Sequence, residues 1–297
     1  MSEIAGHKIH QLVREACSLL AVGAAAARRT REERARLRAS LDALCEGEAS
    51  VPATLGRLEH EARTGCMERT LAIVGPAEEP LREDLWRLLD PALTARGGTL
   101  ALAGHRYEAW AHDELARRVA ELGRTRHEAM LAPLSDFSKN CEQLVGLFHT
   151  QLATAVRETL GVGLELPAWE AEFTPPTRPD ISISPAFDLR FDWLYAVIPA
   201  VWVRPWFRRH LQRRLTWETE KNLSRLASQW SRALAESIAT QAGKARIHLE
   251  TQRHTLSSLL TAETPDPADW EEAKSCLQES IRDNAVDDPG TFANPSA

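Results

Sequence analysis

Apolar residues recur every three or four positions over most of this 297-residue chain, which is the spacing of amphipathic α-helices. The first such region runs from Ile4 to Glu46, with a bend expected near Gly23, and a second covers residues 53–66. Residues 107–160 are predicted to form one long helix with Pro133 as its kink, because proline lacks the backbone N–H and crowds the preceding turn. The pattern therefore favours helix almost everywhere.

The longest apolar stripe begins after Pro205 and meets no further proline until Pro265. An α-helix rises 1.5 Å per residue, so this element would reach roughly 80 Å. Long helices of this kind bury their stripes against one another in antiparallel bundles. We therefore expect an elongated, all-α antiparallel helical bundle that acts as a stalk.

Two short runs bounded by glycine leave the local structure open. Residues 70–75 (TLAIVG) and 97–104 (GGTLALAG) each fit a short strand or a buried turn of helix. The prediction thus allows minor irregular or β pieces near residues 70–104 in an otherwise helical chain.

The same pattern predicts three parts of the chain. Residues 1–105 form an N-terminal helical region, and residues 106–264 form the stalk of long helices, with a tip at 187–214. A connector at 163–185 carries five prolines and should be extended and irregular. Residues 265–297 are predicted to be a short helix and a disordered acidic tail.

Composition narrows the class of protein. The chain has 36 Lys and Arg against 42 Asp and Glu, a net charge of −6, which disfavours nucleic acid as its main partner. The five cysteines form no CxxC pair, so neither a disulfide framework nor a zinc ribbon is indicated, and reduced thiols are expected. They are Cys17, Cys45, Cys66, Cys141 and Cys276.

No stretch reaches the roughly 18 to 20 uninterrupted apolar residues that a membrane-spanning helix needs. Residues 16–27 (ACSLLAVGAAAA) have the look of a signal-peptide core. However, Glu3 and Glu15 acidify what should be a basic leader, and the surrounding apolar stripe is that of an amphipathic helix. We therefore expect these residues to belong to the first helix.

The segment 187–217 is unusually rich in aromatic residues, with eight of the chain's eighteen. Pro199 and Pro205 divide it into short pieces, so it suits a loop or hairpin that dips into lipid without crossing it. The apolar residues predicted to contact a membrane are Phe191, Trp193, Leu194, Tyr195, Val197, Ile198, Val201, Trp202, Trp206 and Phe207.

A basic cluster overlaps this aromatic segment. Residues 190–215 hold six arginines and one acid, Asp192. Tryptophan and tyrosine prefer the headgroup boundary, and each basic side chain near an anionic surface contributes about 1 kcal/mol. The arginines predicted to bind anionic lipid are Arg204, Arg208, Arg209, Arg213 and Arg214. The combination predicts peripheral contact with an anionic membrane surface.

Two other interpretations of this segment stay open. The aromatic side chains would equally plug the end of a helical bundle, with the arginines paired to Glu218, Glu220 and acids on neighbouring helices. Nucleic acid also binds surfaces that combine aromatic rings with arginine, although the overall charge leads us to predict no nucleic-acid partner.

No cluster in the sequence meets the needs of catalysis or of a metal centre. His7 and His10 share a helix face but lack a third ligand nearby. His105 and His112 lie in GHRYEAWAHDE without an identifiable nucleophile or an oriented base pair. We therefore predict no catalytic residue, no cofactor and no metal ligand.

The C-terminal half shows an ordered series of features. A long helix is followed by GVGLELP, the Pro-rich connector, the aromatic segment, WFRRHLQRRL and NLSRLASQWSRALAESIATQAGKARIHLE. With Asn222, Arg225 and Leu226 in an Asn-x-x-Arg-Leu pattern, this order resembles the C-terminal helical region of bacterial dynamin-like proteins. The resemblance covers about residues 107–260 and rests on composition rather than on catalytic motifs. It implies a neck and trunk whose far tip, the paddle, touches membrane at residues 187–214.

The chain departs from that family where a GTPase head would stand. Such a head needs a G-x-x-x-x-G-K-[ST] loop to hold the phosphates, and the sequence contains none. The nearest imitation, TLAIVGPAEEPLRED, offers Gly75 but neither a second glycine nor a lysine, and Glu78 and Glu79 would repel phosphate. The resemblance therefore implies a helical stalk that lacks the GTPase head.

These observations together predict a non-enzymatic, dynamin-like stalk protein that is cytoplasmic and peripheral at the inner face of the membrane. Its expected partners are the anionic membrane surface and a separately encoded dynamin-like GTPase, and a second copy of the chain is a further candidate. The alternative is a soluble helical scaffold or adaptor that binds a protein partner without touching lipid.

Overall fold

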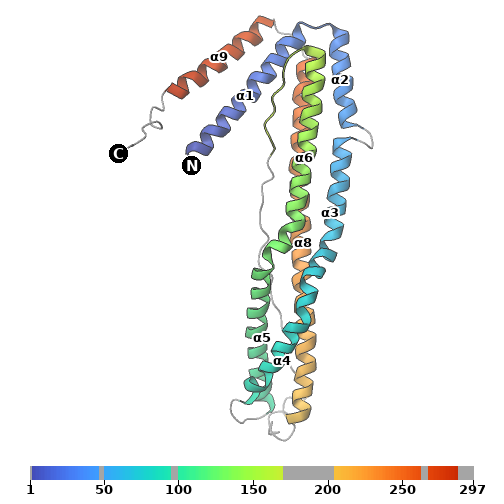
Figure 1. The fold of residues 1–297 in the computed structure, drawn as a ribbon, viewed down its shortest axis with the longest axis vertical. Coiled ribbons are helices and arrows are strands. Elements are labelled where there is room, and N and C mark those ends of the chain that lie inside the picture. The colour runs from blue at the N-terminus through green and yellow to red at the C-terminus, as the bar shows by residue number, and fades with distance from the viewer. Residues whose placement is uncertain (1, 47–49, 95–99, 170–203, 262–266, 287–297) are drawn as a thin grey trace, which may run out of the picture. The chain divides into compact units, whose positions relative to one another are not determined.

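The computed structural model describes residues 2–46, 50–94, 100–169, 204–261 and 267–286. Every regular element among these residues is helical, which confirms the predicted all-α helical bundle. The elements are α1 (Ser2–Ala27), α2 (Arg31–Cys45), α3 (Val51–Val74), the 3₁₀-helix η1 (Gly75–Ala77), α4 (Glu78–Thr94), α5 (Leu100–Thr125), α6 (His127–Leu160), α8 (Arg204–Thr261) and α9 (Pro267–Val286) (Figure 1).

The short apolar runs that the sequence left open are helical where they are described. Residues 70–74 are the last residues of α3, and residues 100–104 are the first residues of α5. No strand occurs within the ranges that the structure describes. Both runs are therefore turns of helix that mix buried and exposed residues, and the allowance for β pieces was not needed in these ranges.

The chain divides into two compact units. Unit 1 contains residues 1–59, 138–172 and 240–297, and unit 2 contains residues 60–137 and 173–239. Helices α3, α6 and α8 each contribute residues to both units. The three parts suggested by the sequence are continuous stretches of chain. The two units differ from them, because each unit combines segments that are distant along the chain.

The first two helices are separated at Arg28–Thr30, and not near Gly23 as predicted. Thr30 caps α2: its hydroxyl accepts a hydrogen bond from the backbone N–H of Glu33 at 3.3 Å, and its own N–H donates to the Glu33 carboxylate at 3.0 Å. The bond from the Thr30 backbone holds the pKa of Glu33 below its ordinary value. A capping box of this kind starts a new helix, which explains the position of the break.

Gly23 lies inside α1 and serves helix packing. A Cβ at this position would lie 3.0 Å from Cε3 of Trp270 on α9, which is closer than side chains normally approach. Helix α1 packs along α9 within unit 1 (Figure 1). The glycine therefore provides room for an indole ring, and it does not bend the chain.

The predicted single helix over residues 107–160 is interrupted at Arg126, seven residues before Pro133. Backbone hydrogen bonds of 3.0 and 2.9 Å still join Arg126 to Leu122 and Met130 to Arg126. Pro133 lies inside α6 and is buried. A proline crowds the carbonyl four residues before it, here that of Ala129, so the interruption at Arg126 lies beyond the turn that Pro133 crowds. The predicted single helix is therefore two helices, and Pro133 lies within the second of them.

Unit 1 combines an apolar core with polar contacts between its helices. Its buried apolar side chains include Leu37, Leu41, Leu55, Val145, Phe148, Leu152, Val156, Leu249 and Leu256. The hydroxyl of Ser138 on α6 donates to the side-chain oxygen of Gln241 on α8 at 2.8 Å. Arg253 on α8 bonds Asp42 on α2 at 2.9 Å, and Arg246 forms an ion pair with Glu59 on α3. Specific polar bonds thus fix the register of α8 against its neighbours in this unit.

A cluster of two histidines and a glutamine also joins α6 to α8 in unit 1. The side-chain oxygen of Gln252 lies 2.9 Å from Nε2 of His149, and its nitrogen lies 2.9 Å from Nε2 of His248. The two Nε2 atoms are 3.4 Å apart. Burial lowers the pKa of both imidazoles, and for His248 the neighbouring His149 adds to the effect.

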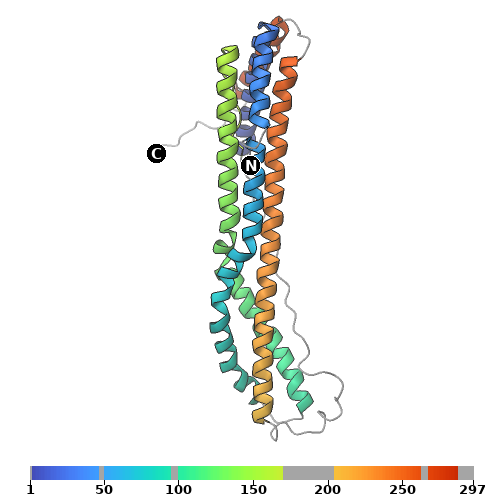
Figure 2. The same cartoon turned by 90° about the vertical axis from the view of Figure 1, so that its right-hand side faces the viewer.

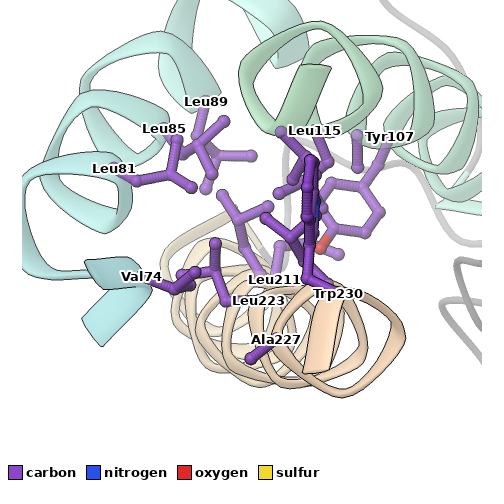
Figure 3. Close-up of a cluster of buried hydrophobic side chains, with 14 of the residues drawn as sticks. Val74, Leu81, Leu85, Leu89, Tyr107, Leu115, Leu211, Leu223, Ala227 and Trp230 are labelled. Carbon is purple, nitrogen blue, oxygen red and sulfur yellow. The ribbon is translucent and has the colours of Figure 1, made fainter. Parts of the chain in front are cut away.

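Unit 2 is built around one cluster of large apolar side chains. Helices α4, α5 and the first part of α8 run together in both views of the fold (Figures 1 and 2). Their side chains, with Val74 of α3, converge between the helices as Figure 3 shows. The labelled members are Val74, Leu81, Leu85, Leu89, Tyr107, Leu115, Leu211, Leu223, Ala227 and Trp230. Apolar volume dominates the interior of this unit.

Charge is nevertheless present in the core of unit 2. Glu218 of α8 is fully buried, and its carboxylate lies 3.3 Å from Nζ of Lys221 and 3.8 Å from Nε of Arg214. The hydroxyl of Tyr107 is buried and finds no hydrogen-bond partner among the described residues. Burial, aided by the negative charge of Glu218, raises the pKa of Tyr107. The tyrosine therefore stays neutral and packs as an apolar residue.

Candidate membrane interface

The start of α8 has one buried face and one exposed face. Pro205 is the second residue of the helix, where its missing N–H costs nothing because the first backbone N–H groups have no partner within the helix. Phe207, Leu211 and Leu215, spaced four residues apart, point into the core of unit 2. Phe207 is only 3% exposed, so its predicted membrane contact was wrong. It shares the helical face of the two leucines and packs with them.

The opposite face of this helix carries Trp206, His210, Arg213 and Trp217, which we call the exposed aromatic face. Their spacings of four, three and four residues place them on one side of a helix. Trp206 is 58% exposed and Trp217 is 47% exposed. The Trp206 ring stacks on the imidazole of His210, with centroids 5.7 Å apart and planes at 14°. Two large indole rings are thus presented to solvent along one stripe.

Trp217 is flanked by two cations of its own helix. The guanidinium carbon of Arg214 lies 5.0 Å from the ring centroid, and Nζ of Lys221 lies 4.8 Å from it. Such cation–π contacts are worth about 0.5–1 kcal/mol at exposed sites. They hold the ring in place, and both cations also lie beside the carboxylate of Glu218.

The predicted lipid-binding arginines differ in their surroundings. Arg208 bonds Asp90 of α4 at 2.8 Å, and Arg214 lies beside Glu218. These two contacts follow the alternative interpretation, in which the arginines pair with acids of the bundle. Arg209 and Arg213 are exposed and form no ion pair with the described residues. Arg204 is the first residue of α8, and its side chain lies outside the described set.

Most of the predicted apolar contact residues also lie outside the residues that the structure describes. They are Phe191, Trp193, Leu194, Tyr195, Val197, Ile198, Val201 and Trp202. Of the ten apolar residues predicted, only Trp206 is therefore described and exposed.

The surface around the exposed aromatic face is positively charged. Residues 204–217 include five arginines and no Asp or Glu, whereas the whole chain is acidic. The next acid, Glu218, is buried, and its carboxylate lies beside Arg214 and Lys221. A local positive potential is therefore combined with exposed indole rings, which suits an anionic, partly apolar ligand.

The sequence prediction missed His210, Trp217 and Lys221 as members of this surface. Trp217 was counted among the aromatic residues but was not assigned to the contact set. A helical projection from Trp206 would have found both His210 and Trp217, because they follow it at helical spacing. Phe207 and Trp217 lie on different faces of the helix, and only the structure shows which of the two faces is buried.

The polar residues near His105 and His112 do not form a reactive arrangement. Nδ1 of His105 lies 3.6 Å from Glu108, and Nδ1 of His112 lies 3.4 Å from Asp113, all on one exposed side of α5. Tyr107 points the other way, into the core. Gly75 belongs to η1 between two helices, and not to a strand-to-loop transition of the kind that cradles phosphate.

Neither a cluster of metal-binding side chains nor a helix fit to span a membrane occurs among the described residues. They contain no group of three or more His, Cys, Asp or Glu side chains placed to hold a metal ion. None of their helices is both long enough and apolar enough to cross a membrane. Comparisons with protein families, curated proteins and solved structures find no match for this chain.

Proposed function

We propose that this chain is a non-enzymatic, dynamin-like helical stalk protein that binds the surface of an anionic membrane through the start of α8. The observation that carries the proposal is the exposed aromatic face, in which Trp206 and Trp217 are 58% and 47% exposed beside Arg209, Arg213 and Arg214. The family part of the proposal rests on the sequence resemblance alone.

The physical basis is a combination of two weak attractions. Indole rings gain free energy at the headgroup boundary, because the ring leaves water while its N–H stays hydrated. Each arginine near an anionic leaflet adds about 1 kcal/mol, which is screened by salt. The apolar and aromatic residues of the preceding segment 187–203 would add to the first of these terms. Binding of this kind is peripheral and reversible.

The proposal also includes a separately encoded GTPase partner. The chain has the long helices implied by the resemblance but no phosphate-binding loop. A neighbouring reading frame with an intact G-x-x-x-x-G-K-[ST] motif would support a split system, and its absence would weaken it. Direct evidence would be co-purification of that product with this chain.

Vesicle co-sedimentation tests the membrane contact. The full chain should pellet with vesicles that contain about one-third phosphatidylserine and remain in the supernatant with pure phosphatidylcholine. Binding should weaken as ionic strength rises from 50 to about 500 mM, because the Debye length shortens. Replacing Trp206 and Trp217 by serine should reduce binding several-fold at every salt concentration.

Matched variants separate this surface from general effects of charge and hydrophobicity. Arg209→Gln with Arg213→Gln should weaken binding, whereas Arg117→Gln with Arg124→Gln makes the same change in net charge on exposed positions of α5 and should not. Ile247→Ser removes an equally exposed apolar side chain from α8 in unit 1 and should also leave binding unchanged. Equal pelleting of all variants, or equal binding to neutral and anionic vesicles, would refute the proposal.

The alternative function, a scaffold that binds a protein without lipid, is favoured by a different observation. Ile9 and Leu12 of α1 are 61% and 62% exposed and lie three residues apart, on one side of the helix. Exposed apolar side chains at this spacing are typical of a contact with another helix. If the chain ignores vesicles but Ile9→Ser with Leu12→Ser abolishes co-purification of a partner, the scaffold is the better description.

A further inference from the structure

The cluster of His149, His248 and Gln252 in unit 1 has a geometry that hydrogen bonding explains only in part. The Nε2 atoms of the two imidazoles approach each other to 3.4 Å. An ordinary hydrogen bond between nitrogens is about 2.7–3.2 Å long, so the direct contact between the two rings is a long and weak one. Each ring nitrogen also lies 2.9 Å from one end of the Gln252 amide, so polar atoms of α6 and α8 gather at one place.

The separation of the two nitrogens matches that of two ligands on one metal ion. Two imidazole nitrogens that bind a tetrahedral Zn²⁺ at about 2.0–2.1 Å lie about 3.3–3.4 Å apart. The observed value is 3.4 Å. Nitrogen atoms of neutral imidazole are the preferred protein ligands of Zn²⁺ and of its neighbours in the first transition series.

Gln252 supplies the third group. Its side-chain oxygen is 2.9 Å from Nε2 of His149, and its amide nitrogen is 2.9 Å from Nε2 of His248. Without an ion, the amide therefore bridges the rings, accepting from one and donating to the other. With an ion, a small rotation of the amide would bring its oxygen to the same centre as the two nitrogens. The helix holds His248 and Gln252 on one face, four residues apart.

An ion would reach this cluster from a cleft. His149 lines a cleft of about 440 Å³ in unit 1, together with residues of α1 and of the segment that follows α6. The other lining residues are Gln11, Arg14, Glu15, Thr150, Ala153, Leu164, Glu165, Leu166, Pro167 and Ala168. The cleft also leaves room for water as a fourth ligand, which three-ligand zinc sites ordinarily retain.

We propose that His149 and His248, with the side-chain oxygen of Gln252, form a binding site for a divalent transition-metal ion of the Zn²⁺ type. The site joins α6 to α8, so the ion would clamp the two helices of unit 1 together. This site is independent of the proposed membrane contact, because its residues belong to unit 1 and the exposed aromatic face belongs to unit 2.

Titration calorimetry of the full chain with ZnCl₂, after treatment with EDTA, tests the proposal. The wild-type chain should bind one ion with these residues, and His149→Ala or His248→Ala should weaken that binding by about tenfold or more, since even second-shell losses cost 10 to 100-fold. His254→Ala removes an exposed histidine from the same helix and should leave the affinity unchanged. Equal Zn²⁺ affinity of wild type and the His149 and His248 variants would overturn the site, as would no binding by wild type.

A second measurement covers the case in which an alanine variant does not fold. Addition of Zn²⁺ to the wild-type chain should slow amide hydrogen exchange in peptides that contain His149 and His248. Peptides that contain His105 and His112 of α5 serve as controls, since those histidines lie in unit 2, and their exchange should not change. Equal slowing in both sets of peptides would indicate adventitious binding to surface histidines and would overturn the proposal.

Discussion

The helices of the two units are held together by different kinds of side-chain contact. In unit 2, leucines, Tyr107 and Trp230 fill the space between α4, α5 and α8 (Figure 3). In unit 1, α8 is tied to α6, α3 and α2 by side-chain bonds that involve Gln241, Arg246 and Arg253. Large apolar side chains supply stability without much direction, whereas polar bonds are directional and set register.

The stability of each unit and the precise alignment of its helices therefore depend on different side chains. A leucine in a large core can be exchanged for another apolar residue of similar volume at modest cost. When one member of a buried hydrogen-bonded pair is removed, the other member is left without a partner. We therefore expect unit 2 to be sensitive to loss of volume, and unit 1 to be sensitive to loss of single polar partners.

The largest effect is expected from a cavity in unit 2. Leu85→Ala removes a fully buried side chain and should lower the free energy of unfolding by about 2–5 kcal/mol. Urea denaturation followed by circular dichroism measures the change, and Leu85→Met, which conserves volume, is the control. A loss below about 1 kcal/mol for the alanine variant would show that the core of unit 2 is loosely packed.

A smaller effect is expected when a polar tie of unit 1 is cut. Arg246→Ala leaves the carboxylate of Glu59, which is only 9% exposed, without this partner and should cost about 1–3 kcal/mol. The control is Arg232→Ala, which removes an exposed pair with Glu236 and should change stability by less than about 1 kcal/mol. Equal effects of the two variants would argue against a structural role for the inner pair.

Glycine substitutions sharpen the comparison within unit 1. At Gly23 a methyl group meets the ring of Trp270, so Gly23→Ala should lower stability by about 1 kcal/mol. At Gly146 of α6 a methyl group meets nothing within 4 Å, so Gly146→Ala should raise stability by about 0.5–1 kcal/mol through helix propensity. Thermal unfolding measures both, and a stabilising Gly23→Ala would contradict the close packing of α1 on α9.

The smallest effect concerns acid and the start of α2. The bond from the Thr30 backbone lowers the pKa of Glu33, so the folded form favours the carboxylate. The contribution of this bond to the stability of α2 is therefore fully present at pH values above the ordinary pKa of glutamate, and it is lost as the pH falls through the lowered pKa of Glu33. Amide exchange of α2, corrected for intrinsic rates, should show this loss in the wild type and not in Glu33→Ala. Glu32→Ala, in the same turn but outside the capping box, should behave as wild type.

The sequence predicted the helices well because their signal is repeated over many residues. It misplaced the breaks because each depends on a few local contacts. The capping box at Thr30 and Glu33 was visible as a Thr-x-x-Glu pattern, yet Gly23 was chosen because glycine often marks a helix end. Gly123 lies three residues before the interruption at Arg126, but the prediction placed the distortion at Pro133 instead.

The candidate interface was predicted in part for a related reason. Composition identified the aromatic and arginine-rich segment, but composition does not say which face of a helix turns inward. Trp206 and Phe207 are adjacent in sequence, and one is exposed while the other is buried. The pair of His149 and His248 was not predictable, because 98 residues separate the two and only the packing of α6 on α8 brings them together.

The nested arrangement of the two units also sets an order for biosynthesis. Every residue of unit 2 lies between positions 60 and 239, whereas unit 1 includes both ends of the chain. On a translating ribosome, unit 2 is therefore complete while residues 240–297 of unit 1 have yet to be made. The apolar helices of unit 2 can therefore pack together early. The later turns of α8, which carry His248 and Arg253, are synthesised after their partners on α6 and α2, so the packing of unit 1 is completed last.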